Sequence, residues 1–246
     1  KIEGNSLRLE EIASEIFRGI YIPSAQRRKL PEGKIPFITR NSDVGRYFYH
    51  NIHHVRLPKS SWKNKAEKVM VPRVFLKALR GNRLNASYDD GTILTTVELV
   101  NITFTPSSKY DPYMIVAVIN SKVPSYYIQH MLYSKTTESA RILDEPYSKT
   151  IRLPLVNFQE NDDEANSKFG FLINAFENSL EELELNRAIS RIINHQNSNS
   201  QLLHDFLSYL SEMMYQLHNI RIEMKYNLNV FYYLNRDTYF VKFSDV

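Results

Sequence analysis

The apolar residues of this 246-residue chain change their spacing after residue 158, and this change constrains the fold more than any single motif. Before that point they form short extended segments separated by Pro, Gly and Asp, a pattern typical of strands joined by turns. After it they recur every three or four residues over long stretches, which is the period of an amphipathic helix. The sequence therefore predicts an α+β chain, with a strand-rich domain over residues 1–158 and a long antiparallel helical hairpin over residues 159–246.

The predicted hairpin consists of two helical stripes joined by the polar segment 194–200. A helix of roughly 25–30 residues is about 40 Å long, so the pair has the dimensions of a spacer or an assembly surface. The apolar faces either only close the hairpin on itself or also dock another subunit as a coiled coil, and both possibilities stay open. The first stripe comprises Phe169, Leu172, Phe176, Leu180 and Leu183, and the second Leu202, Phe206, Leu210, Met213, Leu217, Ile220, Met224 and Leu228.

Local patterns divide residues 1–158 into further elements. Apolar spacing predicts a short helix over residues 7–17 and a second helix over residues 111–133, interrupted near Pro124. Pro112 suits the first position of that second helix. Residues 88–91, Tyr-Asp-Asp-Gly, form a strong turn signal. Strands are predicted at residues 35–39, 68–72, 91–97, 99–104 and 151–155.

The composition excludes several classes of protein. With no cysteine, the chain has no disulfide framework, thiolate zinc site or catalytic thiol. Its seven glycines form neither G-x-G-x-x-G nor G-x-x-x-x-G-K-[ST], so a phosphate-cradling loop is not expected. No stretch approaches the roughly 20 apolar residues of a membrane span. The chain begins with Lys1 and no apolar signal segment follows, so we interpret it as part of a longer, cytoplasmic protein.

Positive charge is concentrated in the first half of the chain. Residues 1–110 carry 19 Lys and Arg against 10 Asp and Glu, whereas residues 159–246 carry 7 against 13. Between Arg18 and Arg83 the counts are 16 and 3. Lys and Arg that neutralise phosphates release condensed counterions, so this segment indicates a polyanion partner. The alternative is a solvated basic face that binds nothing.

Four clusters of basic and polar residues are the candidate DNA-binding positions. Arg pairs bidentately with guanine edges, Asn does so with adenine, and Lys and Ser mainly contact phosphates. Composition alone does not separate the residues that read bases from those that anchor phosphates. The clusters are Arg18, Tyr21, Arg27, Arg28 and Lys29; Thr39, Arg40, Asn41, Ser42 and Arg46; Lys63 and Lys65, beside Trp62; and Arg73, Lys77, Arg80 and Arg83.

Three motifs that resemble reaction centres have simpler interpretations. Asp111-Pro-Tyr113 is similar to the loop that holds a flipped adenine in amino-methyltransferases, but it lacks one proline and suits a helix N-terminus better. Histidines at 50, 53 and 54 have no cysteine and no nearby carboxylate pattern to complete a zinc site. Glu32-Gly-Lys34 and Glu223-Met-Lys225 have the spacing of half a nuclease site, which we interpret as coincidence. We therefore predict no catalytic and no metal-binding residues.

Several segments, taken in order, resemble a target-recognition domain of restriction-modification systems. Residues 9–20, Leu-Glu-Glu-Ile-Ala-Ser-Glu-Ile-Phe-Arg-Gly-Ile, and residues 33–39 resemble the opening of such a domain. Residues 113–121, Tyr-Met-Ile-Val-Ala-Val-Ile-Asn-Ser, resemble its helix, and residues 151–155 its last strand. These domains occur in type I restriction specificity subunits and in the TaqI-like C-terminal specificity domain of adenine-N6 DNA methyltransferases. The helical hairpin matches the spacer that follows them.

The resemblance implies a non-catalytic module that reads double-stranded DNA and directs adenine-N6 methylation. Its partners would be DNA and a methyltransferase domain or subunit, with a restriction subunit as a further candidate. The cofactor S-adenosylmethionine would belong to that partner and none to this chain. Only one recognition domain is present, which favours the tail of a fused methyltransferase or a half-length specificity subunit. A restriction endonuclease with a divergent metal site and a helical protein-interaction module are the alternatives.

Overall fold

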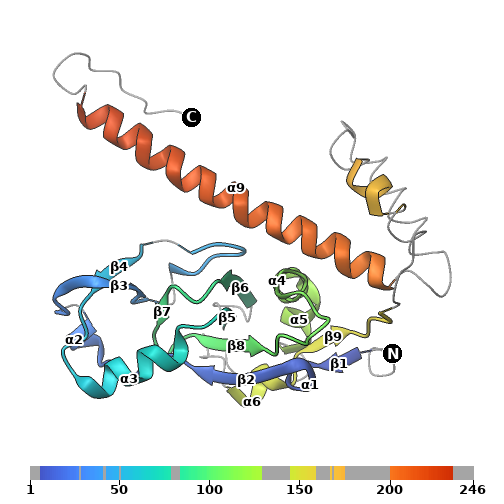
Figure 1. Cartoon of the computed structure of the whole chain (residues 1–246), viewed down its shortest axis with the longest axis horizontal. Helices are drawn as coiled ribbons and strands as arrows, with labels where there is room; N and C mark the ends of the chain where they lie inside the picture. Colours follow the sequence, from blue (N-terminus) through green and yellow to red (C-terminus); the bar gives the residue numbers. More distant parts are fainter. Residues whose placement is uncertain are drawn as a thin grey trace.

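The computed structural model of this chain has an α+β fold, as the sequence predicts (Figure 1). Among the described residues, all strands lie before residue 155, and the 35-residue helix α9 (Ser200–Leu234) follows them. The fold-class prediction is therefore confirmed. The structure describes residues 6–27, 29–40, 43–49, 51–78, 84–128, 145–158, 167, 169–174 and 200–234.

A four-stranded sheet lies at the centre of the strand-rich region. Its strands are antiparallel in the order β2, β8, β5, β6. One face buries Leu76, Val100 and Ile102 against Ile115 and Ile119 of the helix α4 (Pro112–Asn120). Two apolar layers thus enclose the main core. The strands are β2 (Ala13–Arg18), β5 (Arg73–Ala78), β6 (Leu84–Asp89) and β8 (Val100–Phe104).

Side chains from two helices bind the backbone of β6. The Asn120 side-chain oxygen accepts from the Ala86 N–H at 2.8 Å, and its amide nitrogen donates to the Ala86 carbonyl at 3.0 Å. The hydroxyl of Ser125, in α5 (Lys122–Tyr127), accepts from the Leu84 N–H at 3.0 Å. Asn120 and Ser121, which belong to the segment that carries the sequence resemblance, therefore both have structural roles. Asn120 binds the strand, and Ser121 caps α5.

The described residues between 20 and 70 form a small lobe around a second sheet. Strand β3 (Glu32–Ile38) pairs antiparallel with β4 (His53–Val55) and parallel with β7 (Leu94–Thr95). The helix α3 (Ser60–Val69) covers it with Trp62 and Ala66, which pack against Phe37 and Leu57. A short helix, α2 (Ser24–Arg27), lies at the start of the lobe. The small lobe therefore has its own core, separate from the main one.

The two cores meet where the chain leaves β2. The Ile20 N–H donates to the Thr95 carbonyl at 2.8 Å, and Ile20 bridges to Thr96. A Cβ at Gly19 would lie 2.3 Å from the Thr95 carbonyl oxygen and 2.4 Å from that of Thr96. Only glycine allows this approach of the two backbones. Gly19 therefore fixes the small lobe against the central sheet.

A third pair of strands joins the ends of the strand-rich region. Strand β1 (Ser6–Arg8) pairs antiparallel with β9 (Arg152–Pro154), and the Leu9 N–H donates to the Ile151 carbonyl at 2.8 Å. Leu9 begins the short helix α1 (Leu9–Ile12) and is fully buried in the main core. Another short helix, α6 (Glu145–Lys149), precedes β9.

Helix α9 contacts the strand-rich region from its first turns as far as His218 and then extends beyond it (Figure 1). The Asp111 N–H donates to Nε2 of His204 at 3.0 Å, and the His204 ring lies edge-on to Tyr110 and Phe158. Because Nε2 accepts a hydrogen bond there, His204 carries its proton on Nδ1, which lies 2.8 Å from Asp205. These contacts hold the N-terminal end of α4 against the start of α9.

Four predicted elements differ from the structure. The strand predicted at 91–97 is only β7 (Leu94–Thr95), and the helix predicted over 111–133 is interrupted at Ser121, whereas Pro124 lies inside α5. Residues 7–17 were expected to form a helix, but only α1 is helical there, between β1 and β2. An isolated helix of that length is marginal, and ladder hydrogen bonds to β8 and β9 outweigh its weak periodicity. Residues 68–72 were expected to form a strand, but α3 continues to Val69 and β5 begins at Arg73. The burial of Trp62 and Ala66, four residues apart, favours the helix.

Other predicted elements are confirmed. The strand predicted at 99–104 is β8, and the one predicted at 151–155 is β9. Pro112 begins α4, and the Asp111 side chain accepts from the Tyr113 N–H at 2.7 Å as its N-cap. Gly91, at the end of the predicted turn, has φ +97°.

The helical hairpin can be followed only in part. Residues 169–174 are helical, and Leu172 packs against Leu202 and Phe206 at the start of α9. The rest of the predicted first arm, residues 175–199, lies outside the described residues.

Candidate nucleic-acid interface

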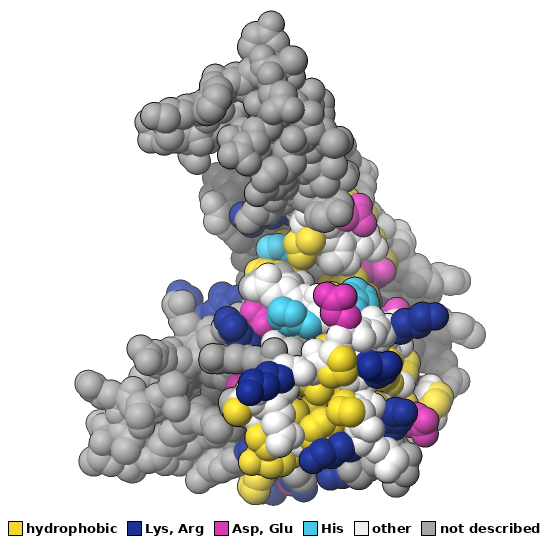
Figure 2. Space-filling view, turned by 90° about the vertical axis from the view of Figure 1, so that its left-hand side faces the viewer, with side chains coloured by type: hydrophobic (Ala, Val, Ile, Leu, Met, Phe, Trp, Pro, Cys, Tyr) yellow, Lys and Arg dark blue, Asp and Glu magenta, His cyan; other side chains and the backbone are white. Residues whose placement is uncertain are grey.

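The small lobe presents a strongly basic surface. Between residues 29 and 67, eight Lys and Arg side chains among the described residues are exposed, against two exposed carboxylates, Glu32 and Glu67. Figure 2 views this side of the molecule, where Lys and Arg side chains surround an uncharged and apolar area. The exposed cations are Lys29, Lys34, Arg40, Arg46, Arg56, Lys59, Lys63 and Lys65.

Strands and helices of the lobe place these cations at intervals along the surface. Lys34 lies on β3, Arg56 follows β4, and Lys63 and Lys65 lie on α3. Lys59, just before α3, holds its Nζ 4.8 Å from the centre of the Trp62 ring. The elements that carry these residues pack around one core, which fixes the positions of their backbones relative to one another.

Arg46 lies on a tightly held loop, the 43–51 loop, of which the structure describes residues 43–49 and 51. Val44 and Tyr49 form an antiparallel bridge, and the Gly45 N–H donates to the Phe48 carbonyl at 2.8 Å. Tyr47 has φ +66° and donates its N–H to the Ala86 carbonyl at 2.9 Å. A non-glycine residue keeps a positive φ only where its surroundings impose it. Arg46 is thus an exposed guanidinium on an ordered loop.

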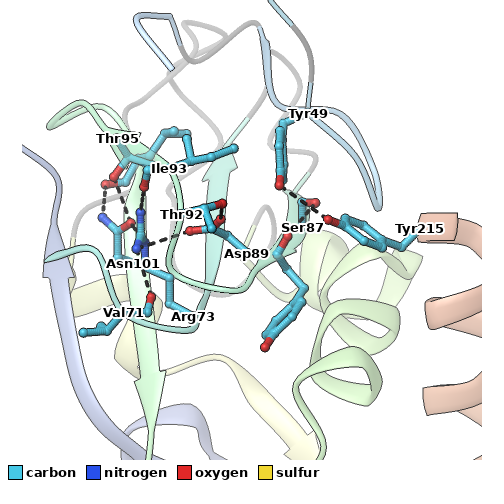
Figure 3. A network of polar contacts seen from close by, with 12 residues as sticks. Tyr49, Val71, Arg73, Ser87, Asp89, Thr92, Ile93, Thr95, Asn101 and Tyr215 are labelled. Atoms are coloured by element: carbon cyan, nitrogen blue, oxygen red, sulfur yellow. Dashed lines mark hydrogen bonds and ion pairs between the residues drawn. The ribbon is translucent and has the colours of Figure 1, made fainter. Parts of the chain in front are cut away.

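Arg73 is a correction to the sequence-based site. Its side chain has 0% exposure and lies in the network of Figure 3. It donates through Nε to the Asn101 side chain at 2.9 Å and through Nη1 to the Val71 carbonyl at 2.9 Å, and it also donates to the Ile93 carbonyl. Nη1 lies 3.3 Å from a carboxylate oxygen of Asp89. Arg73 therefore holds the core together and does not reach a surface ligand.

Burial changes the protonation equilibria of this ion pair. Desolvation raises the pKa of Asp89 above its usual range, and the Arg73 charge opposes that shift. Desolvation likewise lowers the pKa of Arg73, and Asp89 opposes it. Each charge therefore compensates the other inside the sheet, and removing one would leave the other buried without its counter-charge.

Lys77 is a second correction. Its residue is 3% exposed on β5, where burial lowers its pKa and the carboxylate of Asp43 partly restores it. Asp43 is itself 4% exposed and accepts from the Asn51 side chain at 3.1 Å. Lys77 therefore supplies positive charge beneath the base of the 43–51 loop, away from solvent.

Arg27 is mostly engaged inside the protein. Its Nη2 lies 2.7 Å from Glu98, and its Nη1 donates to the Thr39 carbonyl at 2.8 Å. Its side chain is 11% exposed. The guanidinium therefore fastens α2 to the end of β3 and to the segment before β8, with its charge balanced by Glu98.

The remaining predicted residues fall into three groups. Arg18 and Thr39 are half-buried at the ends of β2 and β3. Sequence clustering missed Lys34, Arg56 and Lys59, which were present in the charge count but stood apart from the four clusters. The exposed predicted residues are Tyr21, Lys29, Arg40, Arg46, Lys63 and Lys65, and those outside the described residues are Arg28, Asn41, Ser42, Arg80 and Arg83.

The described residues hold no group of three or more His, Cys, Asp and Glu side chains that could bind a metal ion. His53 and His54 are exposed on β4, and His50 lies outside the described residues. Glu32 and Lys34 are exposed on β3, and Glu223 is exposed on α9. In the described part of the chain, no helix is both long and apolar enough to span a membrane.

Comparison with known proteins gives likenesses to solved structures, but none to a family model or a curated protein. Among solved structures, the HsdS subunit from Thermoanaerobacter tengcongensis is similar over 85% of this chain, with 13% sequence identity and a TM-score of 0.40. The match covers 42% of the HsdS subunit, so this chain spans less than half of that protein's length.

Proposed function

We propose that this chain is a sequence-specific DNA-recognition module that directs adenine-N6 methylation in a restriction-modification system. Residues 1–158 would bind double-stranded DNA, and residues 159–246 would hold this domain at a fixed distance from a methyltransferase domain or subunit. The partner would bind S-adenosylmethionine, extrude the adenine from the helix and transfer the methyl group. The resemblance of the sequence segments to target-recognition domains supports this assignment.

The observation that carries the proposal is the excess of exposed cations on the small lobe. Eight exposed Lys and Arg against two exposed carboxylates give this surface a strong positive potential. A duplex presents phosphates along both strands, and a cation beside each contacted phosphate releases condensed counterions. The count of exposed cations does not include Arg73, Lys77 and Arg27, because these three balance charges inside the protein.

Arg46 and Arg40 are the residues we assign to base reading. Both guanidinium groups are exposed, and Arg46 lies on the ordered 43–51 loop. A guanidinium can donate two parallel hydrogen bonds to a guanine edge in the major groove. An ordered loop loses little conformational entropy on binding, which suits a contact that must discriminate between bases. The lysines of α3 would anchor phosphates.

We assign the far half of α9 to the methyltransferase partner. Leu217, Ile220 and Met224 recur at helical spacing and are 54%, 51% and 59% exposed. They continue the stripe that buries Leu202 and Phe206 near the start of the helix. An apolar stripe that is covered at one end and open at the other fits docking of a further protein element. A restriction subunit is a second candidate for this surface.

Salt-dependent duplex binding by the 246-residue chain tests the DNA assignment. We expect the logarithm of the affinity to fall linearly with the logarithm of salt concentration, and the combined substitution of Lys63 and Lys65 by Ala to flatten the slope by about 2. Lys122→Ala, an exposed lysine on α5, is the matched control and should leave the slope unchanged. Equal slopes for all three proteins would contradict the proposed interface.

The alternative functions give different results in the same preparation. Cleavage of plasmid DNA with Mg²⁺ would favour a nuclease. A stable complex with another protein, together with no duplex affinity at low salt, would favour an interaction module. For the proposed function, Arg40→Ala in the assembled methyltransferase should change which sites acquire N6-methyladenine, whereas unchanged site preference would contradict base reading by Arg40.

A further inference from the structure

We propose that Tyr215 and His218 of α9 are positioning residues that fix the 43–51 loop for DNA reading. This inference rests on the proposed function and deepens it, because it assigns part of the recognition site to the helical region. The geometry points to α9 as a seat for the loop that carries Arg46, and so links the element that docks the partner to the element that reads DNA.

One ring stack and one contact between hydroxyl groups hold the loop against the helix. Phe48 stacks on His218 with ring centroids 4.3 Å apart and an interplanar angle of 30°. The hydroxyl oxygens of Tyr49 and Tyr215 lie 3.4 Å apart, within hydrogen-bond distance (Figure 3). Tyr215 also lies 6.0 Å from Tyr113 on α4, measured between ring centroids. We call Tyr215 and His218, with their contacts to Phe48 and Tyr49, the seat of the loop. Through Tyr215 the seat also connects the loop to α4.

The loop also contacts the sheet below it. The Tyr49 ring lies 5.4 Å from that of Phe75 on β5, and the Tyr47 N–H binds Ala86 on β6. Tyr47 and Asn51 both have positive φ, at +66° and +53°. These two backbone conformations carry a cost for residues other than glycine. The cost must be offset by contacts on both sides of the loop, the sheet on one side and α9 on the other.

The contacting face of α9 is distinct from its exposed apolar stripe. His204, Ser208 and Ser211 are almost fully buried, and with Tyr215 and His218 they recur at steps of four and three residues. This is the spacing of one helix face. Leu217 and Met224 lie at other positions around the helix. A partner bound over the apolar stripe would leave the seat in contact with the loop.

Gly45 has no side chain and therefore leaves room for the Phe48 ring that stacks on His218. A Cβ at Gly45 would lie 2.4 to 2.9 Å from three carbon atoms of the Phe48 ring. The side chain of any other residue would displace that ring from its place against His218. Gly45→Ala is therefore expected to loosen the seat from the loop side, without changing α9.

Cleavage by trypsin after Arg46, followed by mass spectrometry, tests the seat in the full chain. We expect His218→Ala and Gly45→Ala each to raise the cleavage rate about three- to tenfold, the change in open population that follows loss of one aromatic pair. His218→Phe keeps the ring stack and should restore the wild-type rate. Gln216→Ala, an exposed neighbour on α9, is the control and should leave the rate unchanged.

DNA binding by the same variants tests the functional part. The loosened variants should lose about three- to tenfold in affinity for a cognate duplex and discriminate less between duplexes, and His218→Phe should regain both. If cleavage after Arg46 is equal in wild type, His218→Ala and Gly45→Ala, the seat is overturned even where DNA binding persists. If cleavage rises but no chain binds DNA, the loop is restrained for another purpose and the positioning role in DNA reading is overturned.

Discussion

Among the described cationic side chains between residues 18 and 83, two groups look alike in the sequence but differ in burial. The internal group satisfies carboxylates and carbonyls inside the fold, whereas the exposed group faces solvent on the small lobe. The density of Lys and Arg along the sequence therefore reflects two separate things: cations that pair with groups inside the core, and cations that make the surface positive. The internal group is Arg27, Arg73 and Lys77, and the exposed group is Lys29, Lys34, Arg40, Arg46, Arg56, Lys59, Lys63 and Lys65.

The two groups should separate cleanly in experiments on stability and binding. A buried charge removed from its partner leaves an uncompensated charge in the core, which strongly destabilises the fold. An exposed charge removed from a solvated side chain changes stability little, because surface electrostatics are screened. Substitutions in the internal group should thus change unfolding, and those in the exposed group should change binding.

Arg73→Met should have the largest effect. It leaves Asp89 buried without its counter-charge, so we expect the free energy of unfolding to fall by about 3–5 kcal/mol. Urea denaturation monitored by circular dichroism measures this. The double variant with Asp89→Leu should be less destabilised than the sum of the two single variants, since the pair is then removed together. Wild-type stability for Arg73→Met would contradict a stabilising role for the Arg73–Asp89 ion pair.

Arg46→Ala should show the opposite behaviour. If Arg46 contacts a base, we expect the free energy of binding to a cognate duplex to weaken by about 1–3 kcal/mol. We expect the free energy of unfolding to change by less than about 0.5 kcal/mol. Fluorescence anisotropy and urea denaturation on the same sample measure the two quantities. A large loss of stability would blur the division between the groups.

Arg27→Ala should destabilise the fold to an intermediate degree. It removes hydrogen bonds to Glu98 and to the Thr39 carbonyl, and its side chain keeps some solvent access. We expect a loss of about 1–2 kcal/mol in the free energy of unfolding. Lys63→Ala, an exposed lysine on α3, is the control and should change unfolding little. Equal effects of the two substitutions would remove Arg27 from the internal group.

The smallest effect concerns pH and His218. Burial lowers the pKa of His218 below its usual 6.5, and the nearby Arg221 charge lowers it further. The folded state therefore favours the neutral ring, so its contribution to stability is complete above pH 6.5 and decreases as pH falls through the lowered pKa. Thermal unfolding between pH 7.5 and 5.5 should show a slightly smaller decline for His218→Phe than for wild type. An NMR titration that gives His218 a pKa above 6.5 would contradict this.

The sequence predicts those parts of the fold in which local signals and tertiary contacts agree. Asp111 and Pro112 together specify the start of α4, and the apolar alternation of residues 99–104 specifies β8. The weak helical pattern predicted over residues 7–17 is overridden from Ala13 onward by pairing with β8. The strand pairing is a long-range contact, so no local pattern contains it.

The candidate site is less predictable than the fold for a physical reason. Arg73 and Arg40 are the same residue type in the same basic segment, and only the partners brought by β6 and β8 distinguish them. The face of α9 that contacts the strand-rich region has two serines, a tyrosine and two histidines at helical spacing. A search for apolar periodicity selects the other face, so the loop contacts of Tyr215 and His218 were not expected.

The side-chain amide of Asn120 forms hydrogen bonds to β6 as the backbone of a neighbouring strand would. It donates and accepts at Ala86 in the manner of a backbone, and Ser125 takes the amide of Leu84. A strand at the margin of a sheet is otherwise a template for adding a foreign chain. Two helix side chains thus occupy backbone groups at this margin with which a foreign strand would otherwise pair.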